Sequence, residues 1–334
     1  MMRPRLLILG SLCLCGLPPA ATHIQAQSPP GRWESQKSGI GDKLKAVTFV
    51  SEKVGCAVGS CNTILGTKDG GKTWRRLVER KKDGPHWGAI LFTSAKVGWV
   101  RTDDTHNIAQ TTDGGESWNE VPLPKPQEWG LGGVKHAAVG STYFFQYSSS
   151  VYRTDNGGKK WQHLTNTFPA DSLDDGSMSF TDVNHGWAAW KSGHFAVTAD
   201  GGKTWKEGKI NIPHGNYTLT QFVDAKTGWL MPHSATIHTT ADGGQTWHAQ
   251  KMGDNDRALI DMNFVDAKLG HVLAGHNRGY AVWRTTDGGK SWQSLDVLKS
   301  APSYVRALSF PSDQHGGVVG DQGFIGHYDG GPRK

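Results

Sequence analysis

A tight-turn octapeptide, Thr67–Trp74 (TKDGGKTW), returns at nearly constant spacing along this chain of 334 residues. Close copies begin at Thr111, Thr154, Thr198, Thr240 and Thr285, and a truncated seventh copy begins at His327. From one acid position to the next, with Asn156 in the third copy, the intervals are 44, 43, 44, 42, 45 and 42 residues. A period this regular predicts one supersecondary unit that is stacked seven times.

The residues of the octapeptide predict a hairpin corner. An aspartate can accept backbone N–H bonds, two glycines can take positive φ, and the tryptophan can anchor the following strand. A packing anchor is needed in every copy of a repeat, whereas a catalytic group is not, so we interpret the repeated positions as structural. These positions are Asp69, Trp74, Asp113, Trp118, Asn156, Trp161, Asp200, Trp205, Asp242, Trp247, Asp287, Trp292 and Asp329.

A second signature precedes each corner. The run VTFVSEKVGC at 47–56 has counterparts that end at Trp99, Trp187, Trp229, His271 and Gly317. Alternating apolar residues, a polar turn and a Gly-aromatic pair predict strand, turn and strand. With the corner and its two flanking strands, each unit becomes a four-stranded antiparallel blade. The unit from 132 to 161 lacks the Gly-Trp pair and is the irregular one.

The two ends of the repeat region predict how the ring closes. The last corner stops at Gly331 without an outer strand, and Gly31–Gln36 resembles an outer strand without a corner. With Trp33 in the role of Trp74, the count becomes seven complete blades, and the free sheet edges disappear. The predicted fold is therefore all-β, a seven-bladed β-propeller over residues 27–334. The alternative is that residues 31–36 are structureless and the seventh blade has three strands.

The start of the chain predicts export. Met1–Arg5 is basic, and Leu6–Leu17 is mostly apolar but too short to span a bilayer as a mature helix. The pattern predicts a secretory signal peptide that is cleaved after Ala26, which places the mature protein in the periplasm or outside the cell. Lipid anchoring through Cys13 or Cys15 is the alternative, although neither follows a Leu-small-small sequence.

Cys56 and Cys61 are the other two cysteines, and in an oxidising compartment they could close a local disulfide across a hairpin. The formal net charge of the chain is +6. Removal of the leader lowers it slightly, and such a mild excess predicts no nucleic-acid binding. No later stretch is long and apolar enough for a transmembrane helix.

The octapeptides resemble the Asp-box, or bacterial neuraminidase repeat, of sialidases, xyloglucanases, the sortilin ectodomain and the photosystem II stability and assembly factors. The compact seven-unit chain, with a phenylalanine in the inner strand and Gly-Trp after the first turn, is most similar to the assembly-factor group. That resemblance implies an exported, non-catalytic protein without a cofactor, which binds a protein subunit of an envelope or membrane complex. The box itself is shared by hydrolases and binders, so it does not decide the function.

The alternative is a single-propeller glycoside hydrolase, sialidase-like or xyloglucanase-like, with a glycan as its ligand. The Arg-Ile-Pro segment expected of a sialidase does not occur in the sequence, and xyloglucanases usually carry two propellers. The sequence also contains no Gly-x-Ser-x-Gly, His-Glu-x-x-His or phosphate-binding glycine loop. Facing carboxyl groups about 5 to 10 Å apart would favour the enzyme.

Topology predicts where a partner would bind. Loops that enter each inner strand and loops that join the second and third strands meet on one face, around the channel mouth, and the Asp-box corners lie on the other. Aromatic and charged side chains together suit a binding surface. The candidates are Trp87, Trp129, Asp174, Asp175, Trp190, Tyr217, His233, Arg257, His276, Arg278, Tyr304 and Arg306.

Other interpretations of these loop residues remain open. Trp87, Trp129 and Tyr217 could instead cap the core, as aromatics at strand starts often do. His106, His233 and His276 have no diagnostic metal spacing, so no metal site is predicted. Asp174 and Asp175 would be a poor acid and base pair, because adjacent strand residues point to opposite faces.

Overall fold

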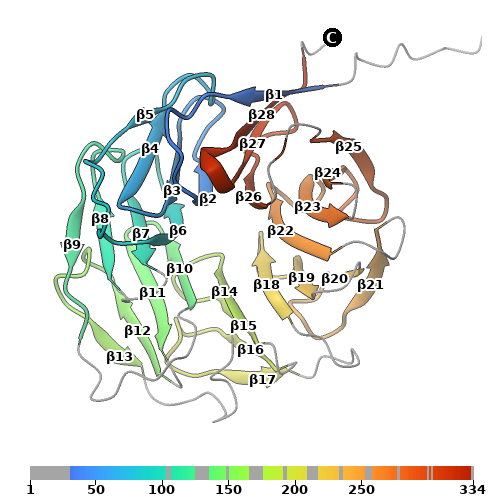
Figure 1. Ribbon diagram of the computed structural model, residues 1–334. Coiled ribbons are helices and arrows are strands. Elements are labelled where there is room, and N and C mark those ends of the chain that lie inside the picture. The colour runs from blue at the N-terminus through green and yellow to red at the C-terminus, as the bar shows by residue number, and fades with distance from the viewer. Residues whose placement is uncertain are drawn as a thin grey trace, which may run out of the picture.

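The computed structural model describes residues 31–102, 107–124, 135–147, 150–164, 176–190, 194–208, 217–232, 236–252, 258–276, 279–298, 301 and 304–331. The described strands form seven four-stranded antiparallel sheets, which are arranged as the blades of one ring (Figure 1). The prediction of an all-β, seven-bladed propeller is confirmed.

The blades follow one another along the chain, and each runs from an inner to an outer strand. Blade 1 holds β2 (Leu44–Phe49), β3 (Gly55–Gly59), β4 (Thr63–Thr67) and β5 (Arg75–Arg76). Blade 2 holds β6 (Trp87–Phe92), β7 (Gly98–Thr102), β8 (Ile108–Thr111) and β9 (Asn119–Val121). Blade 3 holds β10 (Lys135–Val139), β11 (Thr142–Tyr147), β12 (Ser150–Thr154) and β13 (Gln162–Leu164). Blade 4 holds β14 (Gly176–Phe180), β15 (Gly186–Trp190), β16 (Phe195–Thr198) and β17 (Lys206–Gly208).

The remaining blades complete the ring. Blade 5 holds β18 (Tyr217–Phe222), β19 (Gly228–Pro232), β20 (Thr236–Thr240) and β21 (His248–Lys251). Blade 6 holds β22 (Ala258–Phe264), β23 (Gly270–His276), β24 (Gly279–Thr285) and β25 (Gln293–Val297). Blade 7 holds β26 (Val305–Ser309), β27 (His315–Gly320), β28 (Ile325–Asp329) and, from the other end of the chain, β1 (Arg32–Gln36). A short 3-10 helix, η2 (Asp321–Gly323), joins β27 to β28.

Strand β1 closes the ring as the sequence predicts. It pairs antiparallel with β28, and Trp33 lies opposite Tyr328. The Trp33 ring packs edge-on to Phe310, with centroids 6.1 Å apart, as Trp74 packs on Phe49 at 6.0 Å. The two indoles differ in their hydrogen bonds: Trp74 donates to Gly71 of its own corner, and Trp33 donates to Leu295 of blade 6.

Five Asp-boxes are self-contained hydrogen-bond units, at Asp69, Asp113, Asp200, Asp242 and Asp287. Asp69 accepts bonds from the Thr67 hydroxyl (2.8 Å), the Thr73 backbone N–H (2.9 Å) and the Thr73 hydroxyl (2.6 Å). Gly70 and Gly71 have φ of 79° and 90°, where a Cβ would be strained. These contacts satisfy the carboxylate within the corner.

The Phe and Gly-Trp signature positions the seams between blades. An ideal Cβ on Gly228 would lie 2.5 Å from the ring of Phe222, so only glycine lets the phenylalanine pack there. The following Trp229 stacks on Phe264 of the next blade at 3.6 Å, and its indole N–H donates to the carbonyl of Gly288 (3.1 Å). Core side chains thus gather between neighbouring blades.

Blade 3 builds its seams with aromatics from its second strand, which explains its irregular sequence. Tyr143 of β11 stacks on Trp99 of blade 2 at 4.5 Å. The next residue, Phe144, stacks on Phe180 of blade 4 at 3.8 Å. Adjacent residues of one strand point to opposite faces, so this pair replaces both the inner phenylalanine and the Gly-Trp.

The disulfide considered from the sequence does not form. Cys56 and Cys61 are both free thiols. Cys56 is buried in β3 among residues of the blade 1 to blade 2 seam, whereas Cys61 lies beyond the end of that strand with φ of 58°. From Cys56 to Gly59 alone the strand rises roughly 10 Å, more than the spacing that a disulfide allows.

Candidate functional site: the channel mouth beside blades 7 and 1

Two segments of the chain form a groove of ≈ 520 Å³ on the mouth face of blade 7. One wall is residues 35–40, which lead from β1 to β2, and the other is residues 321–324, which include η2. An ideal Cβ on Gly323 (φ 67°) would lie 2.2 Å from the carbonyl oxygen of Ile40, so glycine is required where the walls meet. The groove therefore exists only because the N-terminal strand closes the ring.

Arg306 links the groove to the inner strand of blade 7. A β-bulge between Val305 and Ala307 leaves Arg306 out of register in β26. Its guanidinium forms a two-pronged ion pair with Asp321, with Nε to Oδ1 at 2.6 Å and Nη2 to Oδ2 at 3.2 Å. The hydrogen bond from Arg306 lowers the pKa of Asp321, against an opposing effect of burial. This pair holds η2 over the mouth.

Tyr304 adds an exposed aromatic surface beside that pair. Its side chain is 59% exposed, the most exposed of the large hydrophobic residues that the structure describes. The Arg306 guanidinium lies 5.5 Å from the Tyr304 ring centroid, within the range of a cation–π contact. An apolar ring with a charged group behind it can contact and orient a peptide.

A second ion-pair centre lies on the adjacent rim of blade 1. Asp42 accepts bonds from Arg80 Nε and Nη2, both at 3.0 Å, and Arg76 Nη2 lies 3.6 Å away. The hydrogen bond from Arg80 lowers the pKa of Asp42. The Asp42 side chain is only 11% exposed, so the arginines surround it and extend outward beyond it.

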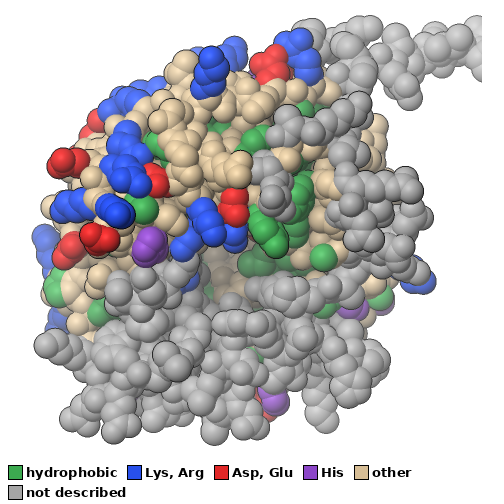
Figure 2. All heavy atoms as spheres, viewed as in Figure 1, with side chains coloured by type: hydrophobic (Ala, Val, Ile, Leu, Met, Phe, Trp, Pro, Cys, Tyr) green, Lys and Arg blue, Asp and Glu red, His purple; other side chains and the backbone are tan. Residues whose placement is uncertain are grey.

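The rim around the groove is positively charged. Segments 35–45, 76–86, 304–306 and 321–324 together carry eight Lys or Arg and four Asp or Glu. Figure 2 shows Lys and Arg side chains gathered over the part of the ring where Figure 1 places β4 and β5. Since the net charge of the whole chain is +6, most of the imbalance is concentrated here.

The structure sorts the candidates predicted from the sequence. Tyr304 and Arg306 lie at the mouth. Trp87 (5% exposed) and Trp190 (0%) are core residues, so the prediction that they contact a partner was wrong. Trp87 donates its indole N–H to Asn62 and fits the core-capping alternative, which was not considered for Trp190. Tyr217 begins β18 and His276 ends β23, but their side chains are outside the description. Outside the described residues lie Trp129, Asp174, Asp175, His233, Arg257 and Arg278.

Sequence reasoning missed the N-terminal wall, Asp42 and η2. The available signal was the pairing of β1 with blade 7, which requires residues 37–43 to cross the mouth from the outermost to the innermost strand. Recognition of that crossing would have placed Lys37, Asp42 and Lys43 at the rim.

The two largely buried aspartates of the described rim, Asp42 and Asp321, are paired with arginines. Asp42 and Asp321 are each held ionised by an arginine, which does not suit either as a general acid. Burial raises the pKa of Asp261 to about 7, but that carboxyl accepts backbone N–H bonds from Met262 and Leu308 between blades. Among the described residues, no three His, Cys, Asp or Glu side chains group as metal ligands. No helix in this part of the chain could cross a membrane.

Solved structures resemble the whole ring. A YCF48 protein bound to D1 peptide superposes with a TM-score of 0.70 at 22% identity, over 90% of this chain and 97% of that one. Virginiamycin B lyase from Staphylococcus aureus gives 0.70 at 12% identity, over 90% and 99%. The GH74 xyloglucanase from Xanthomonas campestris gives 0.67 at 14%, over 88% and 53%. At these identities the likeness shows the fold alone.

Sequence comparison narrows the choice among these propellers. The chloroplastic photosystem II stability/assembly factor HCF136 of Arabidopsis thaliana is 27% identical over 128 residues, which are 36% of this chain and 31% of that protein. Its counterpart from Oryza sativa subsp. japonica is 27% identical over 154 residues, 43% and 36% respectively. The chain thus spans about a third of the length of these relatives. The profile of the photosynthesis system II assembly factor YCF48 matches residues 25–168 and 167–249, most of the chain. This protein therefore belongs to the YCF48 family of photosystem II assembly factors.

Proposed function

We propose that this protein is a non-catalytic assembly or stability factor that holds a segment of a membrane-complex subunit in the groove between residues 35–40 and η2. The observation that carries the proposal is the groove itself, with its positive rim and the exposed Tyr304. The family gives the general role, and a YCF48 structure with a D1 peptide offers a precedent for a protein partner.

The charges of the rim suit an acidic, extended segment. Lys37 and Lys43, at the two ends of the crossing segment, supply positive charge, and a carboxylate placed between them gains both attraction and faster association. Arg306 is already satisfied by Asp321, so its contribution is to hold η2 in place rather than to capture the partner. Tyr304 supplies the apolar contact.

We also infer that the protein works after export. The support is the leader pattern of residues 1–26, a basic start followed by a short apolar run. N-terminal sequencing of the protein recovered from its host tests this inference. A mature start near residue 27 in the periplasmic or secreted fraction supports it, and an intact Met1 in the cytoplasm contradicts it.

Site-specific photo-crosslinking in the host tests where the partner binds. A crosslinking amino acid replaces Tyr304 at the mouth or, as a matched control, Val265, which is 39% exposed on the corner face. We expect one discrete protein adduct from position 304 and none from 265. Adducts from 265 alone would contradict the proposed face.

A charge-reversal pair tests why the partner binds. Lys37→Glu with Lys43→Glu should reduce the adduct yield by roughly tenfold, since two rim attractions become repulsions. Lys226→Glu with Lys268→Glu, in corner-face turns, makes the same change in net charge and should leave the yield unchanged. Equal losses in both pairs would assign the effect to net charge and not to the groove.

A glycoside hydrolase is the competing function, because the fold is shared with a xyloglucanase. Hydrolysis needs two carboxyl groups that are free to exchange protons and face each other across the sugar. Asp42 and Asp321 of the rim are instead paired with arginines. We expect no reducing sugar from xyloglucan and no release of sialic acid from sialosides, and turnover of either would overturn the proposal.

A further inference from the structure

Two histidines occupy positions where other blades carry residues that stay uncharged near neutral pH. His271 stands where Trp99, Trp187 and Trp229 stand in blades 2, 4 and 5. His327 stands where the other six boxes begin with a threonine whose hydroxyl donates to the box acid. The two histidines lie at the two seams of blade 7. His271 belongs to blade 6 and faces blade 7, and His327 belongs to blade 7 and faces blade 1.

His271 fills the seam between blades 6 and 7. Its side chain is fully buried (0% exposed) and stacks on Phe310 with ring centroids 3.9 Å apart and an angle of 12° between planes. Neither ring nitrogen has a hydrogen-bond partner within the described residues. Arg284 pairs opposite His271 on β24, and Asn263 lies opposite it on β22. Burial, with a smaller contribution from Arg284, lowers the pKa of His271 to about 3.

His327 fills the seam between blades 7 and 1. It is 3% exposed, and an ideal Cβ on Gly71 of the first box would lie 3.6 Å from its Nδ1. Neither nitrogen finds a hydrogen-bond partner in the part of the chain that the structure describes. Burial lowers the pKa of His327. The charged or titratable groups that face it are Asp329, Glu34, His315 and Lys72.

We propose that blade 7 is an acid-sensitive latch: protonation of His271 and His327 loosens both of its seams and opens the groove that it forms with residues 35–40. The groove depends on this blade directly, since η2 belongs to blade 7 and residues 35–40 begin in its outer strand. At neutral pH both imidazoles are uncharged and pack as flat apolar rings. An imidazolium in either place would be buried without a hydrogen bond within the described residues, so it favours the open blade. At His327 the carboxylates of Asp329 and Glu34 offset part of that cost, but burial remains the larger effect.

The direction of the pH effect on blade opening follows from the pKa of the histidines in the open and the closed blade. An exposed histidine takes up its proton near its ordinary pKa of 6.5, whereas the closed blade keeps His271 neutral down to about 3. For the histidines, closure is therefore complete at neutral pH and weakens progressively as pH falls below 6.5. Asp261, which accepts the Leu308 N–H in the same seam, acts in the opposite sense, because burial raises its pKa to about 7 and its protonation favours the closed seam. For each such histidine, the opening equilibrium rises by up to roughly tenfold per pH unit. Release of a bound segment by acid would regulate the groove, and that last step alone rests on the proposed function.

Hydrogen exchange at pH 7.5 and 5.0, corrected for intrinsic exchange, tests the latch without any ligand. The full chain carries Asp261→Asn, so that the opposing carboxyl in the blade 6 to blade 7 seam does not titrate. Amides of β26, β27, β28 and β1 should show an opening constant at least roughly tenfold larger at pH 5.0. Blade 2, whose four strands contain no histidine, is the internal reference and should change little. Equal responses in blades 2 and 7, or no response in blade 7, would overturn the proposal.

Variants decide whether the two histidines cause the response. His271→Trp with His327→Thr installs the residues that other blades use, and should leave blade 7 no more acid-sensitive than blade 2. If that protein does not fold, His271→Gln and His327→Thr, made singly, should each remove part of the response. A blade 7 response that persists in every folded variant would contradict the proposal.

A third buried histidine provides the matched control. His238 of β20 is 6% exposed, and burial lowers its pKa to about 4, but it lies within blade 5. His238→Leu, which copies Leu65 of blade 1, should remove acid sensitivity from blade 5 and leave that of blade 7 intact. Crosslinking from position 304 at both pH values then tests the release of a bound partner separately from the opening of blade 7. If blade 7 opens in acid but position 304 gives no adduct at either pH, the proposed function is wrong and the latch still stands.

Discussion

Neighbouring blades pack through different side chains at different seams of the ring. The seam between blades 5 and 6 differs in this way from the two seams of blade 7. Between blades 5 and 6, Trp229 combines a ring stack on Phe264 with an indole hydrogen bond to Gly288. At the next seam His271 keeps the stack, on Phe310, but has no hydrogen bond within the described residues. Between blades 7 and 1 the equivalent residue is Gly317, and Phe49 of blade 1 receives no stacked ring from it.

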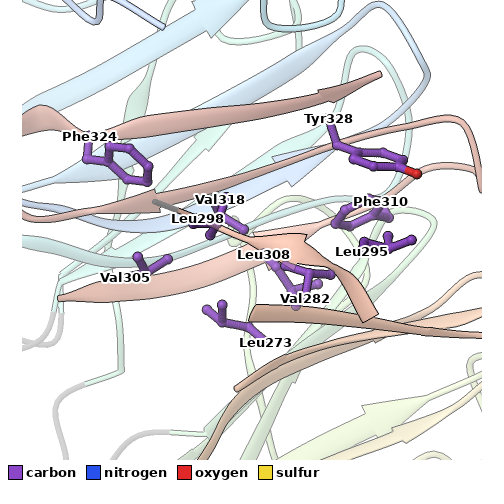
Figure 3. Packing of buried hydrophobic residues seen from close by; sticks show 10 residues of the cluster. All are labelled: Leu273, Val282, Leu295, Leu298, Val305, Leu308, Phe310, Val318, Phe324 and Tyr328. Carbon is purple, nitrogen blue, oxygen red and sulfur yellow. The ribbon is translucent and has the colours of Figure 1, made fainter. Parts of the chain in front are cut away.

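Two further kinds of contact hold blade 7 against blade 6. Asp261 and Asn263 of β22 accept the backbone N–H groups of Leu308 and Phe310, at 2.8 and 2.7 Å. Apolar side chains of blades 6 and 7 also interlock, as Figure 3 shows for Leu273 and Val282 on one side and Leu308 and Phe310 on the other. The comparison teaches that repeated blades need not have equal seams, and that the blade completed by both chain ends is held by groups sensitive to pH.

The largest expected difference in the free energy of unfolding is between variants that remove one stacked ring from each kind of seam. Trp229→Ala loses a fully buried stack and a hydrogen bond and should lower the free energy of unfolding by about 4 kcal/mol. His271→Ala loses a smaller ring without hydrogen bonds and should cost about 2 kcal/mol. Urea unfolding at pH 7.5 measures both, and equal losses would break the comparison.

The Asp-box corners of blades 6 and 7 should also differ, with the blade 7 corner contributing less to stability. Asp287 accepts bonds from Thr285 and from the backbone and hydroxyl of Ser291, whereas Asp329 of the seventh corner accepts one from Gly331. Asp287→Ala should cost about 2 kcal/mol and Asp329→Ala about 1 kcal/mol.

The pH dependence of the first of these variants has a definite sign. Hydrogen bonds from Ser291 lower the pKa of Asp287 to about 2 from an ordinary value of 3.8. The stabilisation is therefore complete above pH 4 and is lost as pH falls toward 2. The difference between wild type and Asp287→Ala should shrink over that range, and a constant difference would argue against the carboxylate as its source.

A smaller contrast is expected from the inner-strand phenylalanines. Phe222 lies under the stacked ring of Trp187 at 3.9 Å, whereas Phe49 is half-buried and faces Gly317. Phe222→Leu should cost about 1.5 kcal/mol and Phe49→Leu roughly half of that, because less ring contact is lost. Chemical unfolding of the two variants at one pH measures the order, and the reverse order would mean that Gly317 does not weaken its seam.

The thiols should give the smallest effect on stability. Burial raises the pKa of Cys56 to about 12, and Cys61 is partly exposed. A chain that begins at residue 27 should therefore melt at the same temperature with and without reductant. In the native state Cys61 should react with a thiol reagent, and Cys56 should react only after unfolding. A melting point that falls on reduction would show that the two sulfurs are bonded.

Local sequence patterns predicted much of the fold. The Asp-Gly-Gly corners, the alternating inner strands and the fixed period each follow from one blade's own residues, and they predicted blade count, strand order and closure by Trp33. The same logic failed for Trp87 and Trp190, because a tryptophan at a strand end looks the same in sequence whether it faces solvent or the neighbouring blade.

The sequence by itself therefore determined the repeating unit and the ring, since turn chemistry and side-chain alternation act over a few residues. Only the tertiary structure decided what residues far apart do together. The groove joins residues 35–40 to residues 321–324, and the burial of His271 and His327 depends on rings supplied by adjacent blades. The physical reason is that burial and charge pairing are properties of a neighbourhood, and in a closed ring the neighbours of blade 7 come from both ends of the chain.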